Sequence, residues 1–472
     1  MRTRRPAFTV PPVLALTALT FVACTDTPSV TEPTGPAPPA ARQVLDAGLV
    51  CTGSLTPFSE CAALVALYNA TDGPNWADNS GWETDPDPCA WAGVTCWGDG
   101  SVQQITLIDQ ALNGTLPAAI GDFPRLVSLR ILRSPNLTGP IPVELADLQE
   151  LKDLTLRRNG FTGGVPSELG SLPVLETLDL TDNELSGSIP PELADLTGLR
   201  SLSLTDNQLT GSIPPVLGGL TSLYSLGLGT NRLSGSIPAE LAGLGDLSFL
   251  GLWGNALTGP IPPELGGMDL EVLRLEENRL TGAIPPELGD LSSLQDLELQ
   301  GNDLSGGIPD ELTRLNPVNG LRLEDNDLGG QVSLAVAAWG ESIMHRCAFV
   351  PGNAGLFMPD LPAYRALDAD ASGDICGLPF SSAEDVADGT VEDIEDLVPD
   401  PLGAGQANAL VSKIDNAVAK ADAGQYQAAI NQLMAFLNQL DQLVADGTLA
   451  PSEAGPLIEQ AQALIDIWTE EL

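Results

Sequence analysis

The sequence predicts an α/β solenoid of about ten coils with a cap at each end, followed by a small three-helix bundle. The pattern LxxLxLxxNxLxGxIPxxLxxLxx recurs every 24 residues, and self-similarity of this period is typical of solenoids. Cysteine-containing segments without the pattern lie on both sides of it, and the last segment has apolar residues at helical spacing. The ten repeats begin at Val102, Leu126, Leu151, Leu175, Leu199, Leu223, Leu247, Leu270, Leu294 and Val318.

Each repeat is expected to form one short strand and then to return along the coil. In the fourth repeat, Leu178 and Leu180 alternate with polar residues, which is strand periodicity. Aliphatic residues over 185–196 then point inward, and each is worth about 1.5–3 kcal/mol when buried. Because a single coil cannot cover them, the coils must stack. The second repeat has one extra residue at 134–136, and the seventh lacks one near Met268.

One asparagine recurs at the point where each repeat leaves the strand. A buried amide there can bond backbone groups that would otherwise cost about 1–3 kcal/mol each. Because a ligand site would not need the same residue in every coil, we interpret this column as structural. Its members are Asn159, Asn183, Asn207, Asn231, Asn255, Asn278, Asn302 and Asn326.

These repeats carry a family resemblance. The phrases LSGSIP (185–190) and LTGSIP (209–214) resemble the plant-type leucine-rich repeats of receptor ectodomains and polygalacturonase inhibitors. Upstream, ALVALYNATDGPNW (63–76) and CAWAGVTC (89–96) resemble the N-terminal cap of that class. The resemblance implies a right-handed arc with a concave strand face, a helix over the first coil and a disulfide between the two cysteines of 89–96. It says little about the partner.

The first residues predict export. A basic start, an apolar stretch over 7–23 and the phrase FVAC resemble the signal peptide of a bacterial lipoprotein, with Cys24 as the lipidated residue. Phe21 stands where such signals usually have Leu, so plain secretion is the alternative. The prediction is a signal peptide over 1–23, a Pro-rich tether over 24–50, and a lipid-anchored, surface-exposed protein that the membrane holds through this lipid alone.

The other six cysteines fit an oxidising compartment. An even number in an exported chain predicts disulfides, and six cysteines allow fifteen connectivities. Locality favours pairing neighbours along the chain, and only the second of these pairs has support from the family. Zinc is disfavoured because the chain has no CxxC pair and a single histidine, His345. The favoured pairs are Cys51 with Cys61, Cys89 with Cys96, and Cys347 with Cys376.

The remaining boundaries follow from changes in composition. Within the C-terminal cap, residues 368–374 imitate the first half of a calcium loop, but Pro379 occupies the twelfth position, so an acidic turn is expected. In the helical module, the phrase over 428–449 resembles the FIMAH module appended to secreted bacterial proteins, and its apolar stripe is interpreted as core. The predicted segments are an N-terminal cap (51–101), repeats (102–332), a C-terminal cap (333–380), an acidic linker (381–402) and the helical module (403–472).

Charge and motifs restrict the function. With 63 acidic and 20 basic residues the net charge is −43, which disfavours nucleic acid as a partner. The chain has no GxSxG, HExxH or phosphate-binding GxxxxGK[ST] motif, so neither catalysis nor a cofactor or metal is predicted. Glu276 and Glu298 on neighbouring strands could form a glycosidase pair, but acidic residues are so common here that we interpret them as solvated.

The residues between the strand leucines point out of the core and form the candidate binding face. Phe249 and Trp253 lie two positions either side of Gly251, so they are expected to share this face. Aromatic residues and arginines dominate binding energy at interfaces. Small neighbours (Gly227, Gly229) and further charged residues (Glu276, Glu298, Arg322, Glu324) accompany them. The predicted ligand-binding residues are Tyr224, Phe249, Trp253 and Arg274, with a basic patch of Arg130, Arg133, Arg157 and Arg158.

The leading hypothesis is a non-catalytic recognition or adhesion protein at the cell surface, which binds a protein or glycan ligand on the concave repeat face. An aromatic platform suits sugar rings, and an arginine patch suits uronates or carboxylates. The alternative is a structural envelope scaffold without a specific ligand, and an extracellular hydrolase is a distant third. The sequence predicts no oligomeric state.

Overall fold

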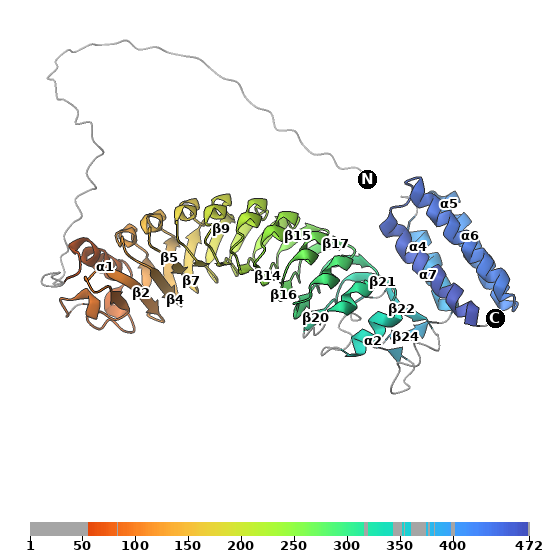
Figure 1. The fold of residues 1–472 in the computed structure, drawn as a ribbon, viewed down its shortest axis with the longest axis horizontal. Coiled ribbons are helices and arrows are strands. Elements are labelled where there is room, and N and C mark those ends of the chain that lie inside the picture. Colours follow the sequence, from red (N-terminus) through yellow and green to blue (C-terminus); the bar gives the residue numbers. More distant parts are fainter. Residues whose placement is uncertain are drawn as a thin grey trace, which may run out of the picture. The chain divides into compact units, whose positions relative to one another are not determined.

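The computed structural model describes residues 55–82, 84–315, 320–342, 352–353, 355–359, 374–375, 378–381, 383–397 and 402–470. Within these ranges the chain forms a capped solenoid and a helical region (Figure 1). The predicted signal peptide and tether, Cys24, Cys51, Cys347, Cys376 and the acidic turn at 368–373 lie outside the described residues. Within the described ranges, no helix combines the length and the apolar character that crossing a bilayer requires.

The N-terminal cap is held together by aromatic rings. Helix α1 (Phe58–Ala70) leads into the short helices η1 (Gly73–Asn75) and η2 (Pro88–Ala90). The ring of Trp82 stacks on Tyr68 at 5.7 Å between centroids and lies 4.8 Å from Trp76 and 4.9 Å from Trp91. All four rings are buried, so this cluster forms the core of the cap.

The disulfide between Cys89 and Cys96, which the family resemblance implied, is confirmed. It joins η2 to β1 (Val94–Cys96), which pairs antiparallel with β2 (Val102–Ile108), the first strand of the solenoid. Cys61 is also disulfide-bonded, and its predicted partner lies outside the described residues. The cap is thus covalently closed beside the first coil.

Replacing both Cys89 and Cys96 with Ser is expected to destabilise the cap by about 2.5 kcal/mol, because the disulfide removes loop entropy from the unfolded chain. Thermal melting followed by tryptophan fluorescence measures the change, since Trp82 and Trp91 lie in the cap. Thr95→Ala, at an exposed position in the same loop, is the control. An unchanged melting transition for the double variant would contradict the expectation.

The concave face is a sheet of 11 strands in which each coil adds one parallel strand in register with the last. For example, Leu202 of the fifth coil aligns with Leu226 of the sixth. The predicted stack of coils is therefore confirmed, and Figure 1 shows these strands along the inner side of the curve. After β2 the strands are β4 (Ser128–Leu132), β6 (Asp153–Thr155), β8 (Thr177–Asp179), β10 (Ser201–Ser203), β12 (Ser225–Gly227), β14 (Phe249–Gly251), β16 (Val272–Arg274), β18 (Asp296–Glu298) and β20 (Gly320–Arg322).

A second sheet, of 13 strands, corrects the expectation of one strand per repeat. The phrase around the fourth large apolar residue of each repeat, such as Leu185, is extended and pairs with its equivalent in the next coil. It has one leucine among small polar residues, so it shows no alternation in the sequence. The strands are β3 (Asn113–Thr115), β5 (Ser134–Pro140), β7 (Asn159–Gly163), β9 (Glu184–Ser188), β11 (Gln208–Gly211), β13 (Arg232–Gly235), β15 (Ala256–Gly259), β17 (Arg279–Gly282), β19 (Asp303–Gly306), β21 (Asp327–Gln331), β22 (Gly355–Pro359), β24 (Leu378–Ser381) and β23 (Asp374–Ile375).

The extra residue of the second repeat is accommodated in this second sheet. The pairing of β5 with β7 shifts register between Ser134 and Thr138, while the first sheet stays regular there. The insertion is therefore absorbed as a local irregularity, and the following coils regain the common spacing.

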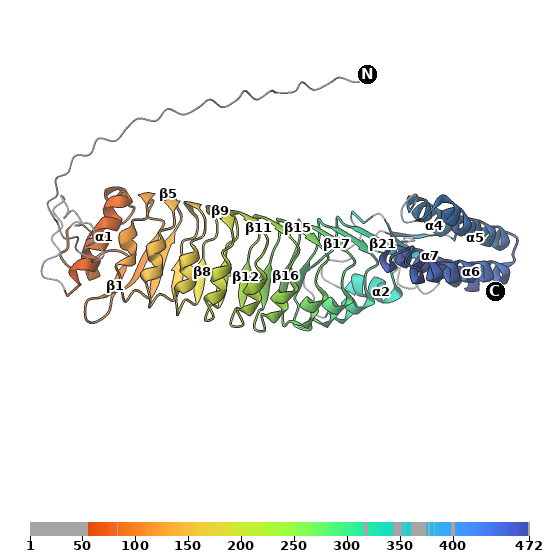
Figure 2. The same ribbon diagram turned by 90° about the horizontal axis from the view of Figure 1, so that it is seen from above.

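Short 3-10 helices complete the first nine coils and repeat along the stack between α1 and α2 (Figure 2). From η4 on, each helix follows a proline that caps it, such as Pro214 before η7. A glycine in η7, Gly218, lies so close to the next coil that a Cβ atom would be 1.9 Å from the Glu240 carbonyl oxygen. These helices are η3 (Ala118–Gly121), η4 (Val143–Asp147), η5 (Ser167–Ser171), η6 (Pro191–Asp195), η7 (Pro215–Gly219), η8 (Ala239–Gly243), η9 (Pro263–Gly267), η10 (Pro286–Asp290) and η11 (Asp310–Arg314).

The core is the predicted spine of aliphatic residues. In the fifth coil all seven are at most 1% exposed: Leu199, Leu202, Leu204, Leu209, Ile213, Leu217 and Leu220. The asparagine column is structural, as predicted. Asn231 accepts a hydrogen bond from the Leu209 N–H of the preceding coil at 2.9 Å and donates to the Leu204 carbonyl of that coil at 2.9 Å. Asn353, which was not predicted, continues this ladder beyond the repeats by accepting from the Leu328 N–H at 3.1 Å.

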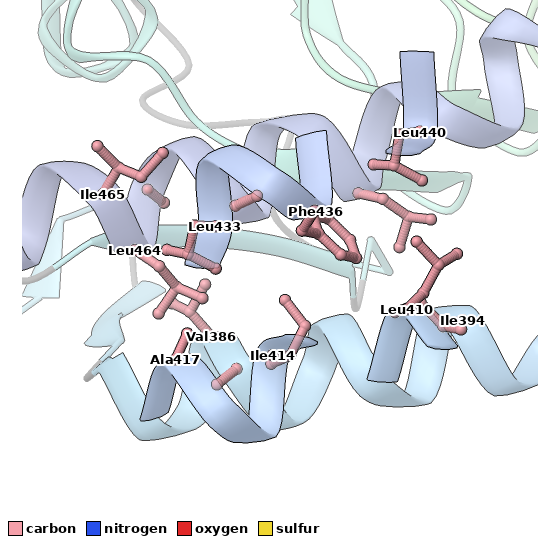
Figure 3. Close-up of a cluster of buried hydrophobic side chains, with 14 of the residues drawn as sticks. Val386, Ile394, Leu410, Ile414, Ala417, Leu433, Phe436, Leu440, Leu464 and Ile465 are labelled. Atoms are coloured by element: carbon pink, nitrogen blue, oxygen red, sulfur yellow. The ribbon is translucent and has the colours of Figure 1, made fainter. Parts of the chain in front are cut away.

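After the last repeat, α2 (Leu334–Ser342) and strands β22 to β24 continue the chain. The helical region then has one helix more than the predicted three: α4 (Ala383–Asp396), α5 (Ala404–Asp422), α6 (Tyr426–Ala445) and α7 (Pro451–Glu470). Figure 3 shows Phe436 of α6 pointing toward Leu410 and Ile414 of α5. The predicted acidic linker over 381–402 is wrong in part, because α4 contributes Val386 and Ile394 to the same core. Its many carboxylates masked an apolar stripe at helical spacing.

Candidate functional site

The candidate site lies on the outward face of the first sheet, in coils six to ten. Positions are counted from the first residue of each coil, so that Leu247 is position 1 of the seventh coil. In coils six to nine, positions 1, 4 and 6 are leucines that point into the core, as do Leu321 and Leu323 of the tenth coil, and positions 3, 5 and 7 point outward. Side chains at these three positions therefore stand next to their equivalents in the neighbouring coils, about 4.8 Å away.

The aromatic pair predicted to share this face does so. Phe249 at position 3 and Trp253 at position 7 make an edge-to-face contact, with ring centroids 6.3 Å apart. The Trp253 ring lies over two glycines: a Cβ atom on Gly229 would be 2.4 Å from it, and one on Gly251 would be 2.3 Å from it. Because Gly229 and Gly251 have no side chains, the Trp253 ring can pack directly against the backbone there. Both aromatic residues stay partly exposed.

Arg274 of the next coil is fixed by this pair. Its guanidinium lies over the Trp253 ring at 4.7 Å from the centroid, which is a cation–π contact. Its Nη2 atom also donates to Glu276 Oε1 at 2.6 Å and to Glu298 Oε2 at 3.3 Å. The side chain is therefore held by an aromatic face and two carboxylates, a more rigid arrangement than a surface ion pair.

Glu276 differs from its prediction as a solvated residue, because it is only 4% exposed. Burial raises the pKa of its carboxyl, and this effect outweighs the nearby Arg274 guanidinium. Its Oε2 atom is buried and has no hydrogen-bond partner among the described residues, and the same holds for Gln300 Oε1 and Glu324 Oε2. These three side chains occupy position 7 of coils eight, nine and ten and are called the acceptor column below.

Glu276→Gln is expected to raise the free energy of unfolding at pH 7. Because the folded-state pKa of Glu276 lies above its ordinary value, the native state binds this proton more tightly than the unfolded state does. The wild type therefore loses stability as the pH rises from the ordinary value through the raised pKa, and the variant lacks this loss. Urea unfolding between pH 4 and pH 8 measures the difference.

Glu264→Gln, at an exposed position on η9, removes the same charge and is the control for that experiment. If Glu276→Gln destabilised the protein at pH 7, the ion pair with Arg274 would outweigh the burial of the carboxylate, and the expectation would be wrong.

A groove of about 670 Å³ lies where the strands of coils five to eight begin, on the N-terminal side of Phe249. Tyr224 lines it and is 55% exposed, and the Tyr224 carbonyl accepts a hydrogen bond from the Phe249 N–H at 3.2 Å. The groove is polar, with more carboxylates than guanidinium groups. Its other lining residues are Arg200, Ser201, Ser222, Gly245, Asp246, Ser248, Asp269, Glu271 and Ser293.

The predicted basic patch is separate from this site. Arg130 lies on β4, five strands from β14, so it is about 24 Å from the aromatic pair. Arg133 and Arg158 lie at the corner after the strand with φ of 61° and 60°. All three are exposed and ion-paired: Arg130 with Asp153 at 3.6 Å, Arg133 with Asp109 at 2.9 Å, and Arg158 with Asp182 at 3.5 Å. Arg157 is exposed at position 7 of the third coil.

The structure thus brings Phe249, Trp253 and Arg274 together, places Tyr224 in the adjoining groove and leaves the other four arginines elsewhere. The sequence predicted Glu276 and Glu324 as charged residues of this face, but it did not predict Gln300 or the column that the three side chains form. The available signal was a run of acceptor-bearing side chains at position 7 in three consecutive coils.

The fold and this face define the chain as a leucine-rich repeat solenoid. Family models described as leucine rich repeats match residues 149–209, 269–291 and 293–315, and a model described as the leucine rich repeat N-terminal domain matches residues 59–97. The repeats are therefore of the plant type, with the N-terminal cap of that class.

Among curated relatives, a polygalacturonase inhibitor of Pyrus communis is 40% identical over 76 residues, which cover 16% of this chain and 23% of that protein. The chain thus matches less than a quarter of that relative's length. Solved structures are also similar to this chain, two plant proteins among them. The ectodomain of the Arabidopsis thaliana receptor kinase GASSHO1/SCHENGEN3, in complex with CASPARIAN STRIP INTEGRITY FACTOR 2, is 36% identical with a TM-score of 0.57 and covers 65% of this chain and 38% of its own. A plant ice-binding protein is 30% identical with a TM-score of 0.56, and the match covers 64% of this chain and 96% of that protein.

Proposed function

We propose that the chain is a non-catalytic binding protein that holds a protein ligand, including an extended peptide segment, against the concave sheet of coils six to ten. The observation that carries this proposal is the Trp253 ring, seated on Gly229 and Gly251, stacked under Arg274 and still partly exposed. Fixed aromatic and arginine side chains are the residue types that dominate binding energy at interfaces. The printed names of the relatives, an inhibitor and a receptor ectodomain in complex with a factor, support the same class of function.

The proposal includes export to the cell surface of a bacterium. It rests on the sequence: the signal-like residues 1–23, the lipobox-like cysteine Cys24 and the FIMAH-like module over 403–472. Detergent phase partitioning of the wild type and of Cys24→Ala tests the anchor, since only an acylated chain enters the detergent phase. Protease treatment of intact cells distinguishes an outward-facing protein from a periplasmic one.

Trp253→Ala is expected to weaken ligand binding by about 2 kcal/mol, or roughly thirtyfold in dissociation constant, because it removes the centre of the aromatic cluster. The mature chain is immobilised, proteins and glycans are captured from its natural surroundings, and the affinity of each captured ligand is measured for both variants. Trp97→Ala is the matched control, because Trp97 also carries an arginine over its ring, Arg125 at 5.0 Å, but lies in the N-terminal cap.

Equal ligand affinity of the wild type and Trp253→Ala would show that the ligand does not bind on the concave face around Trp253. Capture of a glycan in place of a protein would keep the site and change the ligand class. Absence of any selective ligand would favour the envelope scaffold.

A second candidate function, ice binding, is favoured by the outer face of the second sheet. There the residue after the strand leucine, or after Phe161 in the third coil, is a small hydroxyl side chain in coil after coil, about 4.8 Å apart. A regular array of this kind can order water in a repeating layer. The similar plant ice-binding protein supports the candidate. The array consists of Thr138, Thr162, Ser186, Thr210, Ser234, Thr258, Thr281 and Ser305.

The two candidates use different faces, so one pair of variants separates them. If the protein binds ice, Thr210→Lys should reduce the gap between its freezing and melting temperatures, while Trp253→Ala should not. Absence of such a gap in the wild type would dismiss this candidate and leave the concave site as proposed.

A further inference from the structure

The acceptor column specifies the chemistry of the ligand at the concave site, an inference that rests on the proposed function. Glu276 Oε2, Gln300 Oε1 and Glu324 Oε2 are buried oxygen atoms without a hydrogen-bond partner among the described residues. They belong to consecutive coils, whose strands β16, β18 and β20 adjoin in the sheet. Buried polar atoms in native proteins nearly always have partners, so three unpaired acceptors on one face indicate a missing donor.

The neighbouring side chains do not supply this donor. Arg274 Nη2 is used by Glu276 Oε1 and Glu298 Oε2, and Gln300 Nε2 donates to Glu298 Oε2 at 3.1 Å. Arg274 Nε is buried and also has no partner among the described residues, but it does not reach any of the three acceptors within hydrogen-bond distance and geometry. Arg322 stands opposite Glu298 in register but makes no ion pair among the described residues. Glu276 is more than nine-tenths buried, so its unpaired oxygen is not satisfied by bulk water.

The charge around the column has the sign that attracts a cation. At positions 5 and 7 of coils eight to ten, Glu276, Glu298 and Glu324 stand against Arg274 and Arg322, and the whole chain carries −43. A field of this sign steers basic ligands toward the site and repels acidic ones. The predicted recognition of uronates or other carboxylates therefore does not suit this part of the face.

A metal ion fits less well than an organic cation. Among the described residues, no three Asp, Glu, His or Cys side chains are grouped so that they could hold a metal. A guanidinium instead offers several donors in one plane and can bridge acceptors on neighbouring coils, which an ammonium, as a point charge, does less well. Arg274 is an example of this arrangement within the chain. Its guanidinium pairs with the carboxylates of Glu276 and Glu298, which belong to adjacent coils, beside Trp253.

We infer that the acceptor column binds an arginine side chain of the ligand. Because the three oxygen atoms are buried in the unliganded chain, the side chains of Glu276, Gln300 and Glu324 must turn outward to accept its N–H groups. The ligand is then a basic peptide segment that crosses the strands, with its arginine on the column and an apolar neighbour against Phe249 and Trp253.

The experiment uses the mature chain and three peptides of equal length, each with one Leu in a Gly and Ser background and two Arg, two Lys or two Glu residues. Titration calorimetry in 0.15 M salt is expected to show binding in the order Arg, then Lys, with none for Glu. Glu324→Gln should weaken binding of the arginine peptide about tenfold, because it replaces a charged acceptor by a neutral one of the same shape. Glu192→Gln, an exposed residue on η6, removes the same charge far from the column and should leave the affinity unchanged.

Equal weakening by both variants would mean attraction by net charge alone and would overturn the inference. So would binding of the glutamate peptide, absence of binding of the arginine peptide at millimolar concentration, or displacement of that peptide by one equivalent of calcium. A captured ligand that depends on Trp253 but binds Glu324→Gln normally would leave the proposed function standing while the inference fails. A captured ligand whose binding does not depend on Trp253 would overturn both the proposed function and the inference.

Discussion

Asn231→Ala is expected to lower the free energy of unfolding by about 3 kcal/mol, one of the two largest effects we predict for a single substitution. The Asn231 amide bonds backbone groups of two coils. It accepts from the Leu209 N–H and donates to the carbonyls of Leu204 at 2.9 Å, Leu228 at 3.1 Å and Gly229 at 3.2 Å. Alanine leaves the Leu209 N–H buried without a partner, and this orphan dominates the cost.

The carbonyls lose less, because each keeps another donor. Asn207 also donates to the Leu204 carbonyl, Asn255 to that of Leu228, and the Asp206 N–H to that of Gly229. Asn231→Asp should therefore fall between the wild type and Asn231→Ala in stability, since it keeps the acceptor and loses the donors. Chemical unfolding followed by circular dichroism measures all three. A loss below about 1 kcal/mol for alanine would mean that water replaces the amide and that the ladder is not structural.

Gly218→Ala is expected to destabilise the protein by about 3 kcal/mol through overpacking. The added methyl group would lie 1.9 Å from the Glu240 carbonyl oxygen and 2.5 Å from its carbonyl carbon, so the backbone of the next coil must move. The same close approach occurs at four other glycines at position 20: Gly121, Gly170, Gly266 and Gly289.

Gly219→Ala is the matched control for that substitution. Gly219 is the next residue in the same helix, and a Cβ atom there would meet nothing within 4 Å. Its replacement should be neutral or slightly stabilising, because alanine restricts the unfolded chain more than glycine does. Similar losses for both variants would show that the helix itself, and not the contact between coils, resists the change.

The parts of the fold that repeat could be predicted from the sequence because one physical constraint acts in every coil. Leu178, Leu202 and Leu226 are buried because each occupies the same inward position of its strand, and the sequence repeats this position in all ten repeats. The second strand of each coil could not be predicted, since its signal is backbone pairing between coils and not a local pattern. Helix α4 was hidden because its surface is acidic, although Val386 and Ile394 keep helical spacing.

The candidate site was predictable only as far as side-chain direction determines it. Alternation along the strand places Phe249 and Trp253 on one face, and the structure shows them in contact. The burial of Glu276 depends on Arg274 of its own coil, and that side chain is held by Trp253 of the coil before and Glu298 of the coil after. Such contacts join residues about 24 positions apart, and the repeat pattern says nothing about positions where the coils differ.

The glycines at position 20 have a further consequence for the length of the molecule. From the first to the seventh coil they alternate with alanine, in the order Gly121, Ala146, Gly170, Ala194, Gly218, Ala242 and Gly266. Each of these glycines makes its close approach to the coil that follows, so these coils associate in pairs, and removal of one whole pair keeps the alternation. Excision of residues 151–198, the third and fourth coils, should accordingly yield a folded, shorter protein in which the disulfide-closed end lies about 10 Å nearer to Trp253. The length of this solenoid can therefore be changed in units of two coils.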